Sequence, residues 1–437
     1  MAQSDAGDSR PAVAITGMGV VSAYGCDAGR FYRGLLDNRQ VIEAVALPRD
    51  PEGRSAWWSM VRDFDPGAWM EPRVIDGTDV LAQWTIAAAA QALRQSGLQP
   101  DPLRTAVVQG TSMSGVQSLM RAQHEIDRHG PAAFPRKTMM KALSNMGAAQ
   151  ITMLHGLHGP SLTISTACAS SIDAIGIATG LIASGRADTA IVGGTEAGHS
   201  LISGAADAEF IPAMVYAPAM FGMQSPSADP RRACMPFDAG RSGIVTSEGS
   251  AAFVLERADL AAQRGAAVFG YVRGYGSIAD AFHPSAPEPS GRWEAQAMRL
   301  ALEDAGLAAD EVDALYAHAT GTPVGDTPEI RAINSVYGGR STPLAVTSIK
   351  GHFGHAAAAS GGLSLVAALL AMAEDRVVHT ANTSRPDPEI AFDVVLGKPR
   401  DMPVGVVGIN AFGFGGQNSA LLVSRAPPGR HATTRLA

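Results

Sequence analysis

Short apolar runs typical of buried strands alternate with longer helical stretches along almost the whole chain. Up to about residue 265 the strand-like runs are at 12–15, 105–109, 189–192 and 251–255, and the helical stretches include 81–95 and 172–182. From about residue 266 the alternation repeats, with strand-like runs at 268–272, 313–317 and 404–409 and helical stretches at 294–305 and 363–373. This alternation predicts an α/β architecture with a mainly parallel sheet.

The composition allows a large core and more than one domain. The chain has 437 residues, of which 46% are hydrophobic and 17% charged. No run of about 20 apolar residues occurs, and residues 1–10 lack the apolar stretch of a signal peptide, so no membrane span is expected. Three cysteines without metal-ligand spacing favour a reducing, cytoplasmic setting with no disulfide and no metal site. The net charge of −7 gives no indication of nucleic-acid binding.

The segment STACASS places a cysteine where a predicted strand turns into a helix. An apolar run at 161–164 precedes this segment and a helical stretch at 172–182 follows it. Backbone N–H groups and the positive end of the helix dipole favour the thiolate of Cys168 there, which is the nucleophilic form. Many buried cysteines are simply small hydrophobic side chains, so this segment alone leaves catalytic and structural roles open.

Two later segments each carry a histidine after a predicted strand. His318 lies in YAHATGTP, at the carboxyl end of the run at 313–317, the edge where α/β sheets bind ligands. His355 lies in SIKGHFGH, five residues after Lys350 and just before a helix of small residues. Either histidine alone has a structural explanation. The combination with Cys168 at a helix start indicates catalysis.

Four motifs together resemble the β-ketoacyl-ACP synthases, the condensing enzymes of fatty-acid and polyketide synthesis. They are STACASS, HATGTPVGD, SIKGHFGHAAAASGG and FGFGGQN. The resemblance is closest to synthase II, the type with a Cys-His-His triad, and it extends from about residue 12 to about residue 424. Further matches are ITGMGVVSAYG, ADTAIVGGTEA, MPFDAGRSG, ADAFHPSAP and RPDPEI.

The resemblance implies a thiolase-like α/β fold in which two similar halves form a five-layer α-β-α-β-α sandwich. Residues 12–265 are then the half that carries the nucleophilic cysteine, and residues 266–425 the half that carries both catalytic histidines. Residues 1–11 and 426–437 are expected to be disordered tails.

The resemblance also implies a reaction that joins two thioesters. Cys168 takes an acyl group from an acyl carrier protein, and a malonyl thioester then loses CO2 to give the enolate that attacks this acyl group. His318 and His355 match the histidines that stabilise the enolate, and the backbone N–H groups of Cys168 and Phe414 match the second oxyanion hole. No cofactor is expected, because the phosphopantetheine arm belongs to the carrier protein.

Further positions match residues that surround the triad in this family. Lys350 and Glu329 match an ion pair expected to orient the two histidines. The side chains expected to bind the pantetheine arm, limit the acyl chain or gate the pocket are Thr320, Thr322, Met113, Phe412 and Phe414. Met139 and Met140 are expected to face this pocket across a dimer interface.

Several departures from the family pattern favour a specialised pathway. Ala319, Ser242 and Gln417 replace residues usual in the family, and the segment at 199–224 is longer and richer in methionine and aromatic residues. They favour a type II polyketide synthase over housekeeping fatty-acid synthesis. The alternative is a non-catalytic partner subunit of the same fold that sets chain length, but such partners usually lack the nucleophile that Cys168 supplies. A thiolase fits the histidine motifs and the glycine loop less well.

The expected partners are an acyl carrier protein and a second subunit. Because carrier proteins are acidic, an acidic chain needs a local basic patch to bind one. Arg136, Lys137 and Lys141 are the nearest candidates, although a solvated helix face explains them equally well. The dimer contains either two identical chains or a relative without the cysteine, with the segment at 138–140 completing the acyl pocket.

Overall fold

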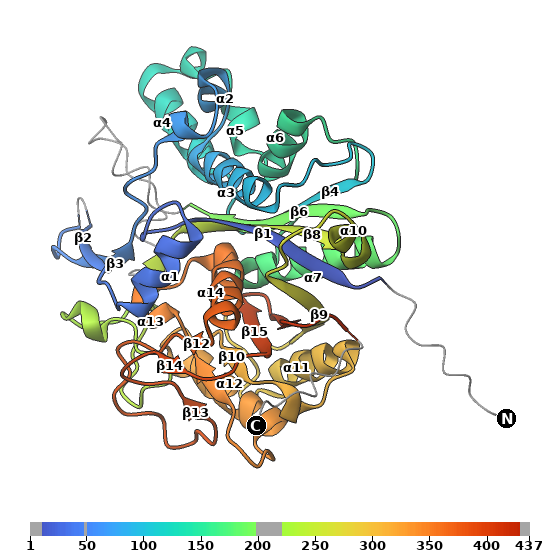
Figure 1. Cartoon of the computed structure of the whole chain (residues 1–437). Helices are drawn as coiled ribbons and strands as arrows, with labels where there is room; N and C mark the ends of the chain where they lie inside the picture. Colours follow the sequence, from blue (N-terminus) through green and yellow to red (C-terminus); the bar gives the residue numbers. More distant parts are fainter. Residues whose placement is uncertain (1–10, 48–49, 198–220, 429–437) are drawn as a thin grey trace.

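The computed structural model describes residues 11–47, 50–197 and 221–428. Within these ranges, eleven strands form a continuous sheet in the order β13-β11-β10-β15-β16-β9-β1-β8-β6-β4-β5 (Figure 1). Most of the two predicted tails and of the long segment at 199–224 lies outside the described residues.

The sheet consists of two halves with the same strand order. The first half runs β1-β8-β6-β4-β5, and the second runs β9-β16-β15-β10-β11 with β13 at its edge. In each half the first two pairings are antiparallel and the next two parallel. The halves join where β1 and β9 pair over three residues. The strands of this sheet are β1 (Val13–Val21), β4 (Thr105–Gly110), β5 (Ser161–Ile164), β6 (Thr189–Glu196), β8 (Gly249–Arg257), β9 (Gly270–Ala279), β10 (Ala314–Tyr316), β11 (Ala345–Thr347), β13 (Asp393–Val394), β15 (Val406–Gly413) and β16 (Gln417–Ser424).

The expectation of a mainly parallel sheet is wrong. Five strand pairings are parallel and five antiparallel. β15 and β16 form a hairpin, and a short turn of this kind can connect only antiparallel strands. The alternation of apolar runs indicates which segments are buried strands, but it does not show whether neighbouring strands run parallel or antiparallel.

Helices cover both faces of each half of the sheet and produce five layers. α3 packs on β1 and β8 at one outer face, and α11 packs on β9 and β16 at the other. α7 and α14 lie between the halves (Figure 1). This is the α-β-α-β-α sandwich expected from the resemblance. The longer helices are α1 (Ala28–Leu36), α3 (Val80–Ser96), α4 (Val116–His129), α6 (Met146–His155), α7 (Ser170–Ala183), α11 (Arg292–Ala305), α12 (Pro323–Tyr337) and α14 (Ser360–Glu374).

Shorter elements fill the connections between these layers. They are the helices α2 (Pro72–Gly77), α5 (Thr138–Ala142), α10 (Ala258–Gln263) and α13 (Lys350–Phe353), the small sheet of β2 (Glu43–Ala46), β3 (Ser55–Ser59) and β7 (Thr246–Ser247), and the pair β12 (Arg376–Val377) and β14 (Arg400–Asp401).

Helix α3 shows how sequence signals position an outer layer. Asp79 caps its first turn by accepting a hydrogen bond from the backbone N–H of Ala82, and Gly97 ends it in the left-handed conformation. The helix lies very close to β1, because a Cβ at Gly17 or Gly19 would collide with a carbonyl group of α3. Small residues on both elements therefore set this spacing.

The two central helices are apolar because protein covers them on every side. Among the described residues, one helix, Ala357–Glu374, has the length and hydropathy of a membrane-spanning segment, and 78% of it is buried inside the protein. It packs against the sheets of both halves and against α7. Burial of this kind is the ordinary reason for an apolar core helix.

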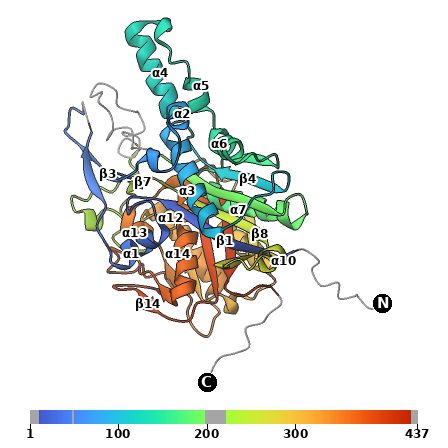
Figure 2. The same cartoon turned by 45° about the horizontal axis from the view of Figure 1, so that its top comes forward.

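The connection between β4 and β5 projects from the sandwich. It contains α4, α5 and α6, and α4 and α5 extend away from the layers (Figure 2). Here and on the edge strand β5 many large apolar side chains are exposed: Leu119, Phe134, Met139, Met140, Leu143, Met153, Leu154 and Leu162. An exposed apolar area beside an unpaired edge strand is typical of a protein–protein interface.

Candidate active site

Cys168 lies at the junction between β5 and α7, as the sequence predicts. A single 3₁₀ turn, Ala167–Ala169, connects the two elements. Ala167 has a φ of 50°, in the left-handed region that non-glycine residues rarely adopt. Ser170 stabilises the turn, since its hydroxyl donates to the carbonyl of Ala167 at 2.7 Å and accepts from the backbone N–H of Thr166 at 2.9 Å. The turn thus presents Cys168 toward the interface between the halves.

His355 follows β11 and α13 and is anchored to the first half. Its backbone N–H donates to the carbonyl of Val245 at 2.8 Å, and its carbonyl accepts from the N–H of Ser247 at 2.9 Å. Nε2 of the ring lies 3.0 Å from Sγ of Cys168. Nδ1 lies 2.8 Å from the hydroxyl of Ser360. Two turns far apart in the sequence therefore bring the sulfur and the imidazole into contact.

His318 follows β10 and lies beside His355. The ring centroids of the two histidines are 5.2 Å apart with the planes nearly perpendicular, and the ring of Phe412 lies 5.8 Å from His318 on another side. Nδ1 of His318 is buried without a hydrogen-bond partner in the described part of the chain. Cys168, His318 and His355 therefore meet at one point, and each side chain is partly exposed there.

Burial favours the neutral form of all three side chains. Burial raises the pKa of the Cys168 thiol to about 11, because desolvation outweighs the positive charge of Lys350 and the backbone N–H groups. Burial and Lys350 lower the pKa of His355 to about 3. The same two causes and His355 itself hold the pKa of His318 well below its usual range. The backbone N–H groups at the helix start favour the thiolate, as expected, but desolvation outweighs them and raises the pKa of the thiol overall.

Glu329 orients His318 through the backbone and not through an ion pair with Lys350. Its two carboxylate oxygens accept from the backbone N–H of His318 at 2.8 Å and of Ala319 at 2.6 Å. The side-chain amide of Asn410 donates to the same carboxylate at 3.0 Å. No ion pair joins Glu329 to Lys350 in the described structure, although the negative charge of Glu329 does raise the pKa of Lys350. The expected ion pair is therefore replaced by electrostatic interaction at a longer distance.

Two backbone N–H groups point at the sulfur of Cys168. They belong to Cys168 itself and to Phe414, and their hydrogen bonds lower the pKa of the thiol. Close approach is possible because Gly413 has no side chain, since a Cβ there would crowd Ala167 and the backbone N of Cys168. This pair of donors has the arrangement that an oxyanion hole requires.

Of the other predicted binding residues, Phe412 lies beside His318 and the backbone of Phe414 bonds Cys168. The hydroxyls of Thr320 and Thr322 are 3.1 Å apart, and Thr322 also caps α12. The side chain of Phe414 is half-exposed and Phe412 is buried. Met113 lies in the turn after β4 and is 41% exposed, so it is not packed in the core of the isolated chain.

Several residues of the site were not predicted from the sequence. Glu196 is buried, bonds the hydroxyl of Ser112 and accepts from the backbone N–H groups of Ser112 and Met113. Its negative charge also acts on Cys168. Asn410 and Ser360 contact Glu329 and His355 as described above. Glu196 is part of the motif ADTAIVGGTEA. The motif could have indicated that this residue matters, but not which groups it bonds.

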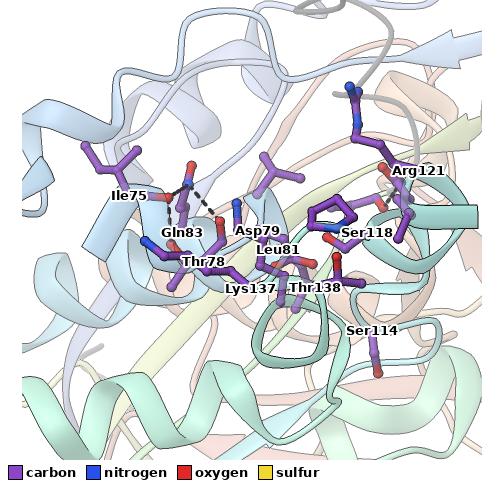
Figure 3. A pocket seen from close by; sticks show the side chains of 16 residues that line it. Ile75, Thr78, Asp79, Leu81, Gln83, Ser114, Ser118, Arg121, Lys137 and Thr138 are labelled. Carbon is purple, nitrogen blue, oxygen red and sulfur yellow. Dashed lines mark hydrogen bonds between the residues drawn. The ribbon is translucent and has the colours of Figure 1, made fainter. Parts of the chain in front are cut away.

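A cavity of about 360 Å³ lies behind the Met113 turn and is distinct from the catalytic point (Figure 3). Asp79, Ser114, Lys137, Thr138 and Lys141 are among the residues that line it. Lys137 forms an ion pair with Asp76. Two of the three predicted docking cations, Lys137 and Lys141, therefore line this cavity in the isolated chain.

Among the described residues no group of three or more histidine, cysteine, aspartate or glutamate side chains is arranged to hold a metal ion. The three cysteines, Cys26, Cys168 and Cys234, are free.

Comparison with known families identifies the family to which this arrangement of Cys168, His318 and His355 belongs. The model of the beta-ketoacyl synthase N-terminal domain matches residues 10–261, and that of the C-terminal domain matches residues 269–384. The chain belongs to the β-ketoacyl synthase family. The enzyme class inferred from the motifs, an acyl-transferring condensing enzyme, is confirmed by this membership.

Curated relatives cover almost the full length of this β-ketoacyl synthase. The 3-oxoacyl-[acyl-carrier-protein] synthase 2 of Coxiella burnetii is 32% identical over 416 residues, which are 94% of this chain and 98% of the relative. The enzyme of the same name from Synechocystis is 33% identical over 412 residues, covering 94% of this chain and 97% of the relative.

Solved structures confirm the thiolase-like fold. The ishigamide ketosynthase/chain length factor has a TM-score of 0.85 at 28% identity and covers 96% of this chain and 100% of that one. A type II PKS acyl-carrier protein in complex with its ketosynthase has a TM-score of 0.84 at 25% identity, with 95% and 100% coverage. A beta-ketoacyl synthase from Burkholderia phymatum also has a TM-score of 0.84, at 27% identity with 95% and 100% coverage.

Proposed function

We propose that this protein catalyses the decarboxylative condensation of a malonyl group on an acyl carrier protein with an acyl group held on Cys168. The observation that carries the proposal is the meeting of three groups from both halves: Sγ of Cys168, Nε2 of His355 at 3.0 Å and the adjacent ring of His318. A nucleophile beside two neutral hydrogen-bond donors fits the chemistry of this condensation.

The first half-reaction is a thioester exchange. The sulfur of Cys168 attacks the acyl carbonyl, the bond to the carrier's thiol breaks, and the proton of Cys168 ends on that thiol. The tetrahedral intermediate carries a negative oxygen, which the backbone N–H groups of Cys168 and Phe414 stabilise. The charge of Lys350 favours the thiolate that forms transiently.

The second half-reaction forms the carbon–carbon bond. The malonyl carboxylate leaves as CO2, and its bonding electrons form an enolate whose oxygen accepts hydrogen bonds from His318 and His355. The enolate carbon attacks the acyl carbonyl, the bond to Cys168 breaks, and the thiolate takes up a proton. Neutral imidazoles suit this role, because each carries one N–H that it can donate to the enolate oxygen.

Residues around the triad bind the rest of the substrate. Thr320 and Thr322 offer hydroxyl groups to the pantetheine arm, Phe414 and Phe412 flank the entrance, and Met113 limits the acyl chain. The arm arrives with the carrier protein, so the proposed reaction uses no resident cofactor and no metal. The free cysteines favour a reducing, cytoplasmic setting.

The favoured pathway is type II polyketide synthesis. Ala319, Ser242 and Gln417 depart from the housekeeping pattern, and two similar structures are a ketosynthase/chain length factor and a type II PKS ketosynthase with its acyl-carrier protein. Fatty-acid synthesis is the competing pathway, since the curated relatives are synthase 2 enzymes. A non-catalytic partner subunit is disfavoured because Cys168 and both histidines are present.

The protein is proposed to act as a dimer through the edge of β5. In the described part of the chain this strand has no partner on its outer side; α6 packs beside it and α5 beside α6, and both helices carry exposed apolar side chains. The partner is a second copy or a relative without the cysteine. Light scattering of the chain alone, and with a co-expressed relative, distinguishes the two, and a stable monomer that is active contradicts the interface.

The decisive experiment is mass spectrometry of the products formed from acyl and malonyl carrier proteins. One condensation adds two carbons and releases one CO2, whereas several rounds on one carrier indicate polyketide synthesis. Absence of any condensation by the wild-type dimer, with every candidate carrier and partner, would overturn the proposed function.

A further inference from the structure

The two ring nitrogens of His355 have different partners. The reaction accounts for the contact of Nε2 with Cys168 but not for the contact of Nδ1 with Ser360. Nε2 lies 3.0 Å from the reacting sulfur of Cys168. Nδ1 lies 2.8 Å from the hydroxyl of Ser360. Ser360 is the first residue of α14 and is 4% exposed. In His318, by contrast, Nδ1 has no hydrogen-bond partner in the described structure.

Counting the available hydrogens shows which group donates in the hydrogen bond between Ser360 and His355. A neutral imidazole carries one N–H, and a serine carries one O–H. Within the described residues, the one hydrogen-bond partner of the Ser360 hydroxyl is Nδ1 of His355. If Nδ1 carried the ring hydrogen, the serine would act as acceptor and its own hydrogen would be buried without an acceptor, which is unfavourable. With the hydroxyl as donor, both groups are satisfied.

We propose that Ser360 is a positioning residue whose hydroxyl donates to Nδ1 of His355 and holds the ring in the tautomer with its hydrogen on Nε2. This inference rests on the proposed role of His355 in the reaction. Nε2–H then points at the sulfur and at the place where the enolate oxygen forms. The residue that sets the tautomer thus lies on the far side of the ring from the chemistry.

The consequence is that His355 acts as a hydrogen-bond donor and not as a base. In the opposite tautomer Nε2 would be an acceptor, able to attract the thiol hydrogen of Cys168 but unable to stabilise the enolate. Loss of the Ser360 hydroxyl removes the preference between the two tautomers. Malonyl decarboxylation, which depends on the donor, is therefore more sensitive to Ser360 than acyl loading of Cys168 is.

The first test measures the tautomer in the resting wild-type enzyme. Protein with 15N-labelled histidine is studied by NMR, and the signals of His355 are assigned by their loss in His355→Gln. We expect Nδ1 to resonate as an unprotonated nitrogen and Nε2 as a protonated one. A protonated Nδ1 overturns the proposal and leaves the condensation reaction untouched, because this readout needs no substrate.

The second test separates the two half-reactions in variants. CO2 release from malonyl carrier protein and single-turnover acylation of Cys168 are measured for Ser360→Ala, Ser360→Thr and the control Ser364→Ala. Ser364 is buried one turn further along α14, and no hydrogen bond joins it to His355. We expect Ser360→Ala to slow decarboxylation about 10- to 100-fold, by analogy with the loss of a group that orients a metal-bound histidine, and to change acylation much less.

The conservative variant and the control decide between positioning and packing. Ser360→Thr keeps the hydroxyl and is expected to recover most of the decarboxylation rate, whereas Ser364→Ala retains both rates. A Ser360→Thr enzyme as slow as Ser360→Ala, or a Ser360→Ala enzyme with normal decarboxylation, overturns the proposal. If Ser360→Ala does not fold, the nitrogen spectrum of the wild type still decides.

Discussion

The turn after β5 and the turn after β11 occupy equivalent places in the two halves but do different chemistry. Each leads through a 3₁₀ turn, Ala167–Ala169 or Ala357–Ala359, into a central helix. The first alanine of each turn has a positive φ, 50° and 42°. Strain of this kind costs on the order of 1–3 kcal/mol per residue and persists only where the surrounding structure enforces it. The two turns therefore share a backbone conformation although they carry different side chains.

The serines that begin the two central helices show how the equivalent turns differ. Ser170 uses its hydroxyl within its own turn, where it bonds Thr166 and Ala167. Ser360 instead directs its hydroxyl to His355. One half thus uses the serine to hold a nucleophile in place, and the other uses it to orient a histidine.

The turns after β4 and β10 form a second equivalent pair. In the first half, Glu196 accepts from two consecutive backbone N–H groups beside Met113. In the second half, Glu329 accepts from two consecutive N–H groups at His318. The same use of a buried carboxylate fixes the backbone at Met113 in one half and at His318 in the other. Each half contributes two such turns, and three of the four carry the side chains that meet at the candidate site, Cys168, His318 and His355.

The largest effect is expected for Cys168→Ala. This substitution gives the turn after β5 the same residue that the turn after β11 has at the equivalent position, Ala358. Condensation should fall at least about a thousandfold, because no other group can hold the acyl chain. Intact-mass spectrometry after loading with acyl carrier protein tests this, with Cys26→Ala as a control that stays acylated. Acyl transfer to Cys26 or Cys234 would contradict the assignment.

The next largest effect concerns the histidines of the second half. His318→Ala and His355→Ala should each slow malonyl decarboxylation about 100- to 1000-fold, the usual cost of removing an oxyanion donor. Acylation of Cys168 should be less affected, since the backbone N–H groups of Cys168 and Phe414 serve that step. Parallel assays of CO2 release and burst acylation measure both. Variants that acylate poorly but decarboxylate normally would reverse the proposed division between the halves.

How far the sequence predicted this site depends on the kind of feature. The motifs located Cys168, His318 and His355, because each lies in a connection that follows a strand, where α/β folds expose functional groups. They did not give the partners of Glu329, which bonds residues both near in sequence and as distant as Asn410. The high pKa of Cys168 also escaped prediction, because desolvation depends on both halves closing around the thiol. Strand direction was missed because a period of two residues is the same in parallel and antiparallel strands.

A selectivity change of intermediate size is expected at Met113, which follows β4 as His318 follows β10. Met113→Ala should lengthen the preferred acyl chain, and Met113→Phe should shorten it. Each buried CH2 contributes about 0.8 kcal/mol, which corresponds to roughly fourfold in selectivity per carbon. Competition between acyl carrier proteins of different chain length measures the profile. An unchanged profile in both variants would show that this turn does not line the acyl pocket.

A smaller effect is expected when the charge of Lys350 is removed. Lys350→Met should raise the pKa of Cys168 above its value of about 11, because the lysine stabilises the thiolate. Alkylation of Cys168 by iodoacetamide at pH 8.5 should then be about 3- to 10-fold slower, since only the thiolate reacts. Cys26 provides an internal control, because its pKa is also raised to about 11 but by burial away from Lys350. Equal changes at both cysteines would indicate a general loosening of the fold.

The smallest effect is on stability and concerns Asp79, in the cavity behind the Met113 turn (Figure 3). Burial raises the pKa of its carboxyl to about 6 from the ordinary 3.8. The folded state therefore holds the proton more tightly than the unfolded state does, so the free energy of unfolding decreases as the pH rises from about 4 to about 6 and is constant above that. Asp79→Asn should retain the cap of α3 and remove this decrease.

Urea unfolding at pH 4 and pH 8 tests this prediction for the wild type and two variants. At pH 8 Asp79→Asn should be more stable than the wild type by on the order of 1 kcal/mol, a value reduced for partial solvent access and for the nearby charge of Lys141. At pH 4 the difference should be smaller. Asp76→Asn is the matched control, because the ion pair with Lys137 lowers the pKa of Asp76 and its contribution has the opposite pH dependence. If Asp79→Asn and the wild type lose stability equally between the two pH values, Asp79 is not the buried acid of this cavity, and the loss arises elsewhere in the protein.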